Sequence, residues 1–382
     1  MLTRRELLTG AATLAAARPS LAQAPAAPVA MARCRTYGPG LTPTMERLFD
    51  GIGGLGRLVK GKTVAIKVNL TGSPSQRLGH APLSDAHWTH DRVIGTTVRL
   101  LDKAGAHRIR ILESPWSTAE PLEEYMLEAN WEPRDILNAG QRVEFENTNY
   151  LGKARKYSRF KVPQCGHLFE TYDLNHSYED CDVFVSIAKL KEHATAGVTM
   201  TLKNCFGITP CTIYGDGAGA DEPSDAPRGG RGAVFHAGRR PPSKSAVPEK
   251  DPSSPRQGGY RVPRAVADLC AARPIHLAII DGVESMAGGE GPWIRGTRRV
   301  SPGVLIAGTN AVCTDAVGAA VMGFDPMAGR GTAPFETCDN TLRLAEELGV
   351  GTRDLKRIEV VGFQIADARF PFRSAKGVTM SR

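Results

Sequence analysis

A dense group of residues able to hold and protonate an anion lies between positions 189 and 207. Lys189 ends a strongly apolar run, and Lys191 and His193 follow it within four residues. Lys203 comes four residues after Thr199, and residues four apart on a helix share a face. Lysines bind phosphate or carboxylate as positive charges, and a histidine exchanges protons near neutral pH. This segment therefore predicts an anion site with proton-transfer chemistry.

Polar residues at other predicted strand ends add to this site. Lys67 and Asn69 alternate with apolar neighbours at the end of one strand, so both side chains point to one face. Asp281 ends another strand, and the loop that follows carries Glu290 and Gly291, where backbone N–H groups are free to approach a ligand. Because ligands bind at the carboxyl ends of strands in open α/β sheets, we expect these residues to converge.

These positions divide into three predicted roles. The catalytic candidates are His193, Lys189 and Asp281. The substrate-binding candidates are Lys67, Asn69, Lys191, Thr199, Lys203, Asn204, Glu290 and Gly291. The metal candidates are His236 and Asp315, of which Asp315 fits a helix-cap role equally well. The plainer alternative, a solvated basic turn before a helix, is disfavoured because cations at a buried strand end are costly to leave unpaired.

The elements that must position these residues alternate between strand-like and helix-like patterns. Apolar runs predict strands at 63–70, 107–112, 182–188, 275–280, 303–308 and 357–361. Helical periodicity predicts helices at 91–104, 311–322 and 341–348. Continuous apolar strands that alternate with helices are typical of an α/β fold, with a mainly parallel sheet and helices on both faces.

One long segment interrupts this alternation. Residues 212–260 are rich in Gly, Pro, Ser, Asp and Arg and contain few apolar side chains. A stretch of this length within a domain is either functional or disordered, and we interpret it as a flexible insertion over the active face. The sequence leaves open whether it forms a small subdomain with residues 114–180 or decorates one sheet.

The composition and the first residues limit the class of protein. The chain has 382 residues, 41% of them hydrophobic, which excludes collagen-like, coiled-coil and wholly disordered proteins. Arg4-Arg5, a short apolar stretch and Ala22-Gln23-Ala24 predict a twin-arginine signal peptide over residues 1–24. Removing its three arginines and one glutamate lowers the net charge from +8 to +6. We therefore expect the mature protein in the periplasm, after contact with the twin-arginine export machinery and without a membrane span.

The eight cysteines are scattered and form no C-x-x-C pair. Proteins exported by the twin-arginine route fold before export, where thiols stay reduced, so we expect mostly buried thiols, with Cys165–Cys181 and Cys205–Cys211 as the open pairings. No ferredoxin-type cysteine run is present, so we expect no iron–sulfur cluster. The cofactor is otherwise unknown, and a divalent metal is compatible with the predicted site.

The motifs, in this order, resemble the domain of unknown function 362 family. They are Ile66-Lys67-Val68-Asn69-Leu70, Glu113-Ser114, Ala188-Lys189-Leu190-Lys191 with His193, Lys203-Asn204 with Phe206-Gly207, Ile280-Asp281-Gly282, Gly289-Glu290-Gly291-Pro292 and Thr314-Asp315-Ala316-Val317. The resemblance implies a family domain over 60–365, a lead-in at 25–59 and a tail at 366–382. Members often carry an iron–sulfur module, and this chain is similar to exported members without one. The family's reaction is not established, so the resemblance implies positions rather than a mechanism.

Two functions fit these observations. The first is an enzyme acting on a small carboxylate or phosphate, and an architectural likeness to nickel-dependent lactate racemase extends the expectation to isomerase or redox chemistry. The second is a periplasmic binding or maturation protein for a metal, cofactor or redox partner, without turnover. Nucleic-acid binding is disfavoured because basic and acidic residues are interspersed and no aromatic stacking series accompanies them.

Overall fold

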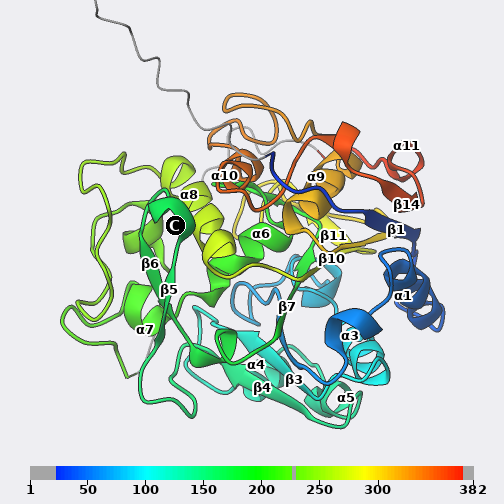
Figure 1. The fold of residues 1–382 in the computed structure, drawn as a ribbon, viewed down its shortest axis with the longest axis horizontal. Coiled ribbons are helices and arrows are strands. Elements are labelled where there is room, and N and C mark those ends of the chain that lie inside the picture. Colours follow the sequence, from blue (N-terminus) through cyan, green and yellow to red (C-terminus); the bar gives the residue numbers. More distant parts are fainter. Residues whose placement is uncertain (1–22, 226–228, 373–382) are drawn as a thin grey trace, which may run out of the picture.

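The structure, a computed structural model, describes residues 23–225 and 229–372. Within them, an eight-stranded sheet runs through the middle of the molecule (Figure 1). Its spatial order is β14 (Val360–Gly362), β1 (Val29–Arg33), β13 (Val304–Gly308), β10 (Leu277–Gly282), β7 (Val183–Lys189), β2 (Thr63–Lys67), β3 (Arg108–Glu113) and β4 (Val143–Asn147). Every neighbouring pair is parallel except the two that β13 makes with β1 and β10. The predicted α/β fold with a mainly parallel sheet is confirmed.

The central strands are continuous apolar runs because helices cover both of their faces. Every residue of β7, β10 and β13 is buried. One face carries α1 (Leu41–Asp50), α2 (Gly56–Val59), α3 (Asp91–Lys103), α4 (Leu122–Glu128) and α5 (Pro133–Leu137). The other carries α6 (Met200–Asn204), α7 (Cys211–Tyr214), α8 (Gly258–Ala272), α9 (Ala311–Val321), α10 (Thr341–Glu347) and α11 (Ile365–Ala368). Figure 1 shows α1, α3 and α5 on one side of the sheet and α8, α9 and α10 on the other.

The chain leaves two neighbouring strands of this sheet in opposite directions. After β2 it passes through α3 to β3 and then to β4 on one side, whereas after β7 it passes through α6 and α8 to β10 on the other. The connections therefore diverge between β2 and β7 and run over opposite faces. In open α/β sheets such a point opens a crevice at the carboxyl ends of the strands, where ligands bind.

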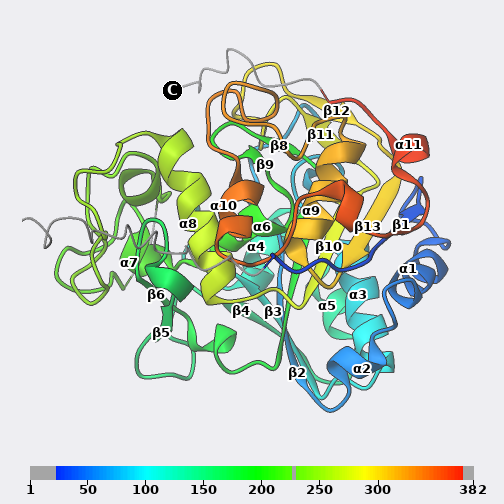
Figure 2. The same ribbon diagram turned by 45° about the horizontal axis from the view of Figure 1, so that its top comes forward.

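Residues 212–260 have buried anchors that their composition does not suggest. Val234 and Phe235, in the single helical turn Gly232–His236, are fully buried. The Phe235 ring contacts the rings of Phe169, Tyr172, Phe206 and Tyr214. Figure 2 shows this segment beside α7, α8 and the antiparallel ribbon of β5 (Ser158–Lys161) and β6 (Thr171–Leu174), at the end of the molecule opposite α1. The described part of the insertion thus packs on the α8 side of the sheet, and its flexibility stays a prediction.

The predicted signal peptide lies almost wholly outside the described residues, as does the chain beyond residue 372. In the part of the chain that is described, no helix combines the length and apolarity that a membrane crossing requires. All eight cysteines are free thiols, six of them buried.

Candidate anion site at the strand ends

The predicted site residues gather where the connections diverge. Lys67 ends β2, Lys189 ends β7 and Asp281 lies at the end of β10. The two-stranded ribbon of β8 (Glu192–His193) and β9 (Gly197–Val198) follows β7 and leads into α6. The structure therefore brings the strand-end residues, the β8–β9 ribbon and α6 to one edge of the sheet, but it gives the lysines different surroundings.

Lys67 belongs to a buried ion pair. Its Nζ lies 2.6 Å from Oε1 of Glu113, which ends the neighbouring strand β3, and 3.0 Å from Oδ1 of Asn204. Both charged side chains are at most 5% exposed. A Cβ at Gly207 would stand 2.9 Å from both charged groups, so a glycine is needed for the chain to pass there. Burial lowers the pKa of Lys67, and the attraction of Glu113 opposes that shift. The protein itself supplies the anion for this lysine.

Lys189 forms a second internal pair. Its Nζ donates to Oδ2 of Asp281 at 2.8 Å, to the carbonyl oxygen of Ser84 and to the hydroxyl of Tyr37. Asp281 also accepts from the Tyr37 hydroxyl and from the backbone N–H of His90. The lysine and aspartate side chains are both fully buried. This geometry gives Lys189 and Asp281 a positioning role beneath the site.

Lys191 is buried, and no carboxylate of the described residues forms an ion pair with it. Its Nζ donates to the carbonyl oxygens of His87 and Glu290, at 2.9 and 2.8 Å. Burial lowers the pKa of Lys191 well below its usual value, and the nearby Lys203 and Lys189 lower it further, whereas the Glu290 carboxylate opposes the shift. Two carbonyl oxygens only partly compensate a buried ammonium, so this lysine adds positive potential to the region.

Lys203 is the predicted lysine whose ammonium has no hydrogen-bond or ion-pair partner among the described residues. It is half-buried on α6, and its ammonium lies 4.1 Å from the ring centroid of Phe206. Among the described residues, no carboxylate forms an ion pair with it and no acceptor takes a hydrogen bond from it. Burial lowers the pKa of Lys203 to about 7, with the charges of Arg231 and Lys67 contributing to that shift and Glu290 opposing it. A bound anion would supply the partner this ammonium lacks.

Two histidines lie close enough to Lys203 for its charge to lower their pKa values. His193 is 8% exposed, and its Nδ1 accepts a hydrogen bond from the backbone N–H of Thr195. Burial and the charge of Lys203 lower the pKa of His193 well below 6.5. The same two causes lower the pKa of half-buried His236 to about 4. Both imidazoles are therefore neutral at pH 7. With Nδ1 of His193 occupied as an acceptor, the ring's proton lies on Nε2.

The turn that presents Lys203 is fixed by a carboxylate. Met200, where α6 begins, has a φ of +36°, which L-residues seldom adopt. Asp315 on α9 accepts from the backbone N–H groups of Thr201 and Leu202 and from the Thr201 hydroxyl. Burial raises the pKa of Asp315 to about 7. Of the two roles predicted for Asp315, the geometry supports the cap.

The remaining candidates line the same region. Glu290 accepts from the backbone N–H of Ala194 and from the indole Nε1–H of Trp293, and its Oε2 lies 4.0 Å from Nδ1 of His193. The hydroxyl of Thr199 donates to the carbonyl oxygen of Glu192. Gly291 packs under the Trp293 ring, where a Cβ would approach within 2.2 Å. Within the described ranges, no three His, Cys, Asp or Glu side chains gather as a metal site would require, so His236 and Asp315 belong to no such group.

Three buried side chains in this region carry polar atoms that have no hydrogen-bond partner among the described residues. They are His87 at both ring nitrogens, Asn69 at Oδ1 and Glu192 at Oε1. His87 is fully buried, Glu192 is 1% exposed and Asn69 is 6% exposed. The His87 ring packs edge-on against Trp88 and Trp293. Unpartnered polar atoms inside a protein are uncommon and often mark functional sites. They make this edge of the sheet a candidate functional site.

Sequence reasoning gave no site role to Glu113, Phe206 or Arg231. Glu113 carried a usable signal, because it ends an apolar strand next in sequence to the one that Lys67 ends. Arg231 carried none, because it comes from the insertion and reaches the site only through folding. There its guanidinium donates to the carbonyl oxygens of Thr209 and Ser114 and lies 5.9 Å from the Phe206 ring centroid.

Comparison with known proteins places the chain in a family. The family described as Domain of unknown function (DUF362) matches residues 64–320, more than half of the chain. The chain belongs to that family. A thylakoid-associated protein of Synechocystis sp. is 26% identical over 186 residues, which cover 48% of this chain and 50% of that protein. The chain therefore spans about half the length of this curated relative.

One solved structure is also similar in part. A crystal structure of a Thermotoga maritima protein shares 20% identity over 43% of this chain and 35% of that chain, with a TM-score of 0.25. The DUF362 match includes every predicted catalytic and anion-binding residue, from Lys67 to Gly291.

Proposed function

We propose that this DUF362 protein is an enzyme that binds a small carboxylate or phosphate at Lys203, holds it by a hydrogen bond from His193 and transfers protons through His236. The observation that carries this proposal is the half-buried Lys203 ammonium, which has no anionic partner among the described residues and stands beside two neutral histidines. A lysine of this kind is a site for a ligand's negative charge.

The charges around Lys203 favour an anion. The charges of Lys67, Lys191 and Arg231 act together with that of Lys203, and the carboxylates that act on these lysines are Glu113 and Glu290. Glu113 is already paired with Lys67. A ligand carrying one or two negative charges would offset the remaining positive charge, and its binding would raise the pKa of Lys203.

The two imidazoles have different roles. Nε2–H of the neutral His193 donates a hydrogen bond to the substrate oxygen on which negative charge develops. The ring nitrogen of His236 takes a proton from one substrate carbon and returns it to another, so the atoms balance without an oxidant. This chemistry fits an isomerisation more directly than a redox reaction, and Lys189 and Asp281 support it from below by holding Tyr37 and the loop that carries His90.

The test is anion binding by matched lysine variants. We expect sulfate, which keeps its charge across neutral pH, to bind the wild-type protein and to bind Lys203→Gln at least about tenfold more weakly, because a charge-assisted contact is lost. Lys161→Gln, which alters an exposed lysine on β5, is the control and should leave the affinity unchanged. Equal sulfate affinity in Lys203→Gln and wild type would overturn the proposed site.

Turnover separates the two candidate functions. Small 2-hydroxy and 2-oxo carboxylates in deuterated buffer, followed by NMR, should exchange a carbon-bound proton in the presence of wild-type protein. His193→Gln should bind sulfate normally yet lose this exchange. Binding without exchange for every carboxylate tested would favour the periplasmic binding or maturation protein.

We also propose that the protein is exported through the twin-arginine route, with cleavage near Ala24, and that it works in the periplasm without an iron–sulfur cluster. The twin-arginine pair in residues 1–24 supports this proposal, and the family match over 64–320 supports a single family domain over 60–365. Replacing Arg4 and Arg5 by lysines should leave the precursor in the cytoplasm. Normal export of that variant would contradict the route.

A further inference from the structure

A cavity separate from the Lys203 site opens at the same edge of the sheet. It measures about 400 Å³ and is lined by residues that follow β1, β10 and β14 and precede β13. Strands β1, β10 and β14 are parallel to one another through the sheet, so their carboxyl ends lie at the ligand-binding edge. A volume of this size suits a small organic ligand.

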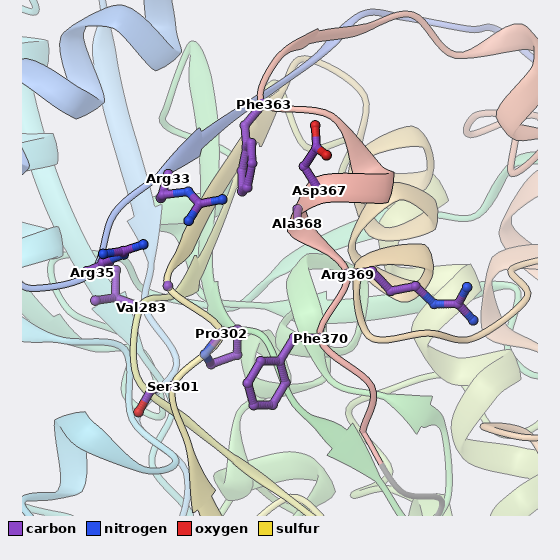
Figure 3. A pocket seen from close by; sticks show the side chains of 11 residues that line it. Arg33, Arg35, Val283, Ser301, Pro302, Phe363, Asp367, Ala368, Arg369 and Phe370 are labelled. Atoms are coloured by element: carbon purple, nitrogen blue, oxygen red, sulfur yellow. The ribbon is translucent and has the colours of Figure 1, made fainter.

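The walls of this cavity are positively charged. Arg33, Arg35 and Arg369 line it together with one acidic residue, Asp367. None of the three guanidinium groups forms an ion pair with a carboxylate of the described chain, and all three side chains are exposed. Figure 3 shows Arg33 and Arg35 on one wall, Asp367 on the other, and Arg369 extending away from them. Arg33 and Arg35 therefore form the anion-binding wall.

An aromatic ring holds one of these arginines in place. The Arg33 guanidinium carbon lies 4.5 Å from the centroid of the Phe363 ring, and Phe370 lines the floor (Figure 3). Stacking on a ring restricts the guanidinium plane while leaving its edge N–H groups free for a planar or tetrahedral anion. The two phenylalanines, with Val283 and Pro302, provide apolar surface beside the positive wall.

We propose that this cavity binds a small molecule in which a phosphate, sulfonate or carboxylate group is carried on a flat apolar ring. The anionic group pairs with Arg33 and Arg35, and the ring packs against Phe363 and Phe370. This site shares no residue with the Lys203 site and does not depend on the proposed reaction. Because arginine stays protonated throughout the ordinary pH range, the cavity holds its ligand with the same affinity from pH 6 to pH 9.

Calorimetry with benzenesulfonate, whose charge does not titrate, tests this inference in the Lys203→Gln protein, so that the other anion site is weakened. We expect one binding site, weakened about tenfold or more in Arg33→Gln by loss of a charge-assisted contact. Methanesulfonate, which has the same anionic group without the ring, should bind about tenfold more weakly. Arg99→Gln, at an exposed position of α3, is the matched control and should bind like its parent.

Three results would overturn the proposal. They are equal benzenesulfonate affinity in Arg33→Gln and its parent, equal affinity for benzenesulfonate and methanesulfonate, and tighter binding of benzylamine than of benzenesulfonate. The last result would mean that Asp367, rather than the arginines, selects the ligand. Thermal melts of each variant guard against misfolding, and since Arg33 is exposed we expect melting temperatures close to that of the parent.

Discussion

Lys189 and Lys203 lie close to the same edge of the sheet, yet their surroundings differ in kind. The ammonium of Lys189 is fully buried and meets Asp281, a hydroxyl and a carbonyl oxygen. Lys203 is half-buried, and within the part of the chain that the structure describes its ammonium contacts an aromatic ring but no acceptor. A buried lysine with a complete set of acceptors holds the fold together, whereas one that lacks an acceptor has a place for a ligand's charge.

The comparison separates two uses of positive charge. Lys67 resembles Lys189, because Glu113 neutralises it inside the protein. Lys191 is intermediate, with carbonyl oxygens but no carboxylate. Of the four lysines predicted to bind an anion, Lys203 is therefore the one that is free to do so. Lys191 adds positive electrostatic potential nearby, and the ion pairs of Lys67 and Lys189 are structural.

The largest expected effect concerns the buried ion pair between Lys189 and Asp281. Lys189→Met should lower the free energy of unfolding by about 3–5 kcal/mol, because it leaves Asp281 buried without its cation. The double variant Lys189→Met/Asp281→Asn, which removes both charges, should recover a large part of that loss. Urea denaturation measures both. A loss below about 1 kcal/mol for the single variant would mean that the pair is not the structural element that its geometry indicates.

The pH dependence of sulfate binding tests whether Lys203, unlike the paired lysines, binds the anion. The pKa of Lys203 is about 7 in the free protein, so this lysine loses its charge as the pH rises above that value. The dissociation constant for sulfate at this site should therefore rise towards about tenfold per pH unit above pH 7. Calorimetry between pH 6 and pH 9 in Arg33→Gln, where the arginine cavity is weakened, gives the profile. A flat profile would mean that Lys203 does not bind the anion.

Replacing Lys203 should raise the stability of the protein, whereas replacing Lys189 should lower it. Because the pKa of Lys203 is about 7 folded and ordinary unfolded, the unfolded chain binds more protons above pH 7, and stability rises with pH across that window. Lys203→Met removes this rise and should increase the melting temperature at pH 7 by about 2 °C. Lys161→Met is the control, with a change within about 0.5 kcal/mol. A marked loss of stability in Lys203→Met would place this lysine with the structural pairs.

The smallest effect on sulfate binding is expected at the cap of α6. Asp315→Asn keeps the shape of the side chain but replaces one acceptor oxygen by a donor facing backbone N–H groups. It should cost about 1–2 kcal/mol in stability and weaken sulfate binding only a few-fold, because Lys203 is then less well positioned. A pH profile of sulfate binding with an unchanged midpoint would distinguish this positioning role from a direct one. A shifted midpoint would mean that Asp315 acts on the Lys203 charge itself.

Much of the fold was predictable because both faces of its strands are buried. The strand predicted at 182–188 is β7, Val183–Lys189, and the helix predicted at 91–104 is α3, Asp91–Lys103. The short strands β1 and β4 carry weaker patterns, and the sequence analysis did not predict them. The antiparallel direction of β13 could not be predicted from the sequence either, because an apolar run has the same pattern in either direction.

The convergence of the candidate site residues at one edge of the sheet was predictable, but their pairing was not. Strand-end positions for Lys67, Lys189 and Asp281 follow from the end of each apolar run. Which cation meets which carboxylate depends on strand order, because Glu113 reaches Lys67 only since β3 lies beside β2. The position of His236 beside Lys203 depends on how the insertion packs through Phe235, which no local pattern predicts.

The most direct test of the difference between these lysines is an NMR titration of the Lys203 side chain, assigned by comparison with Lys203→Gln. The protein without added anion should show a pKa of about 7 for Lys203, and saturating sulfate should raise it by at least one unit. Lys203 titrating at its ordinary value near 10.5, with no response to sulfate, would contradict the account.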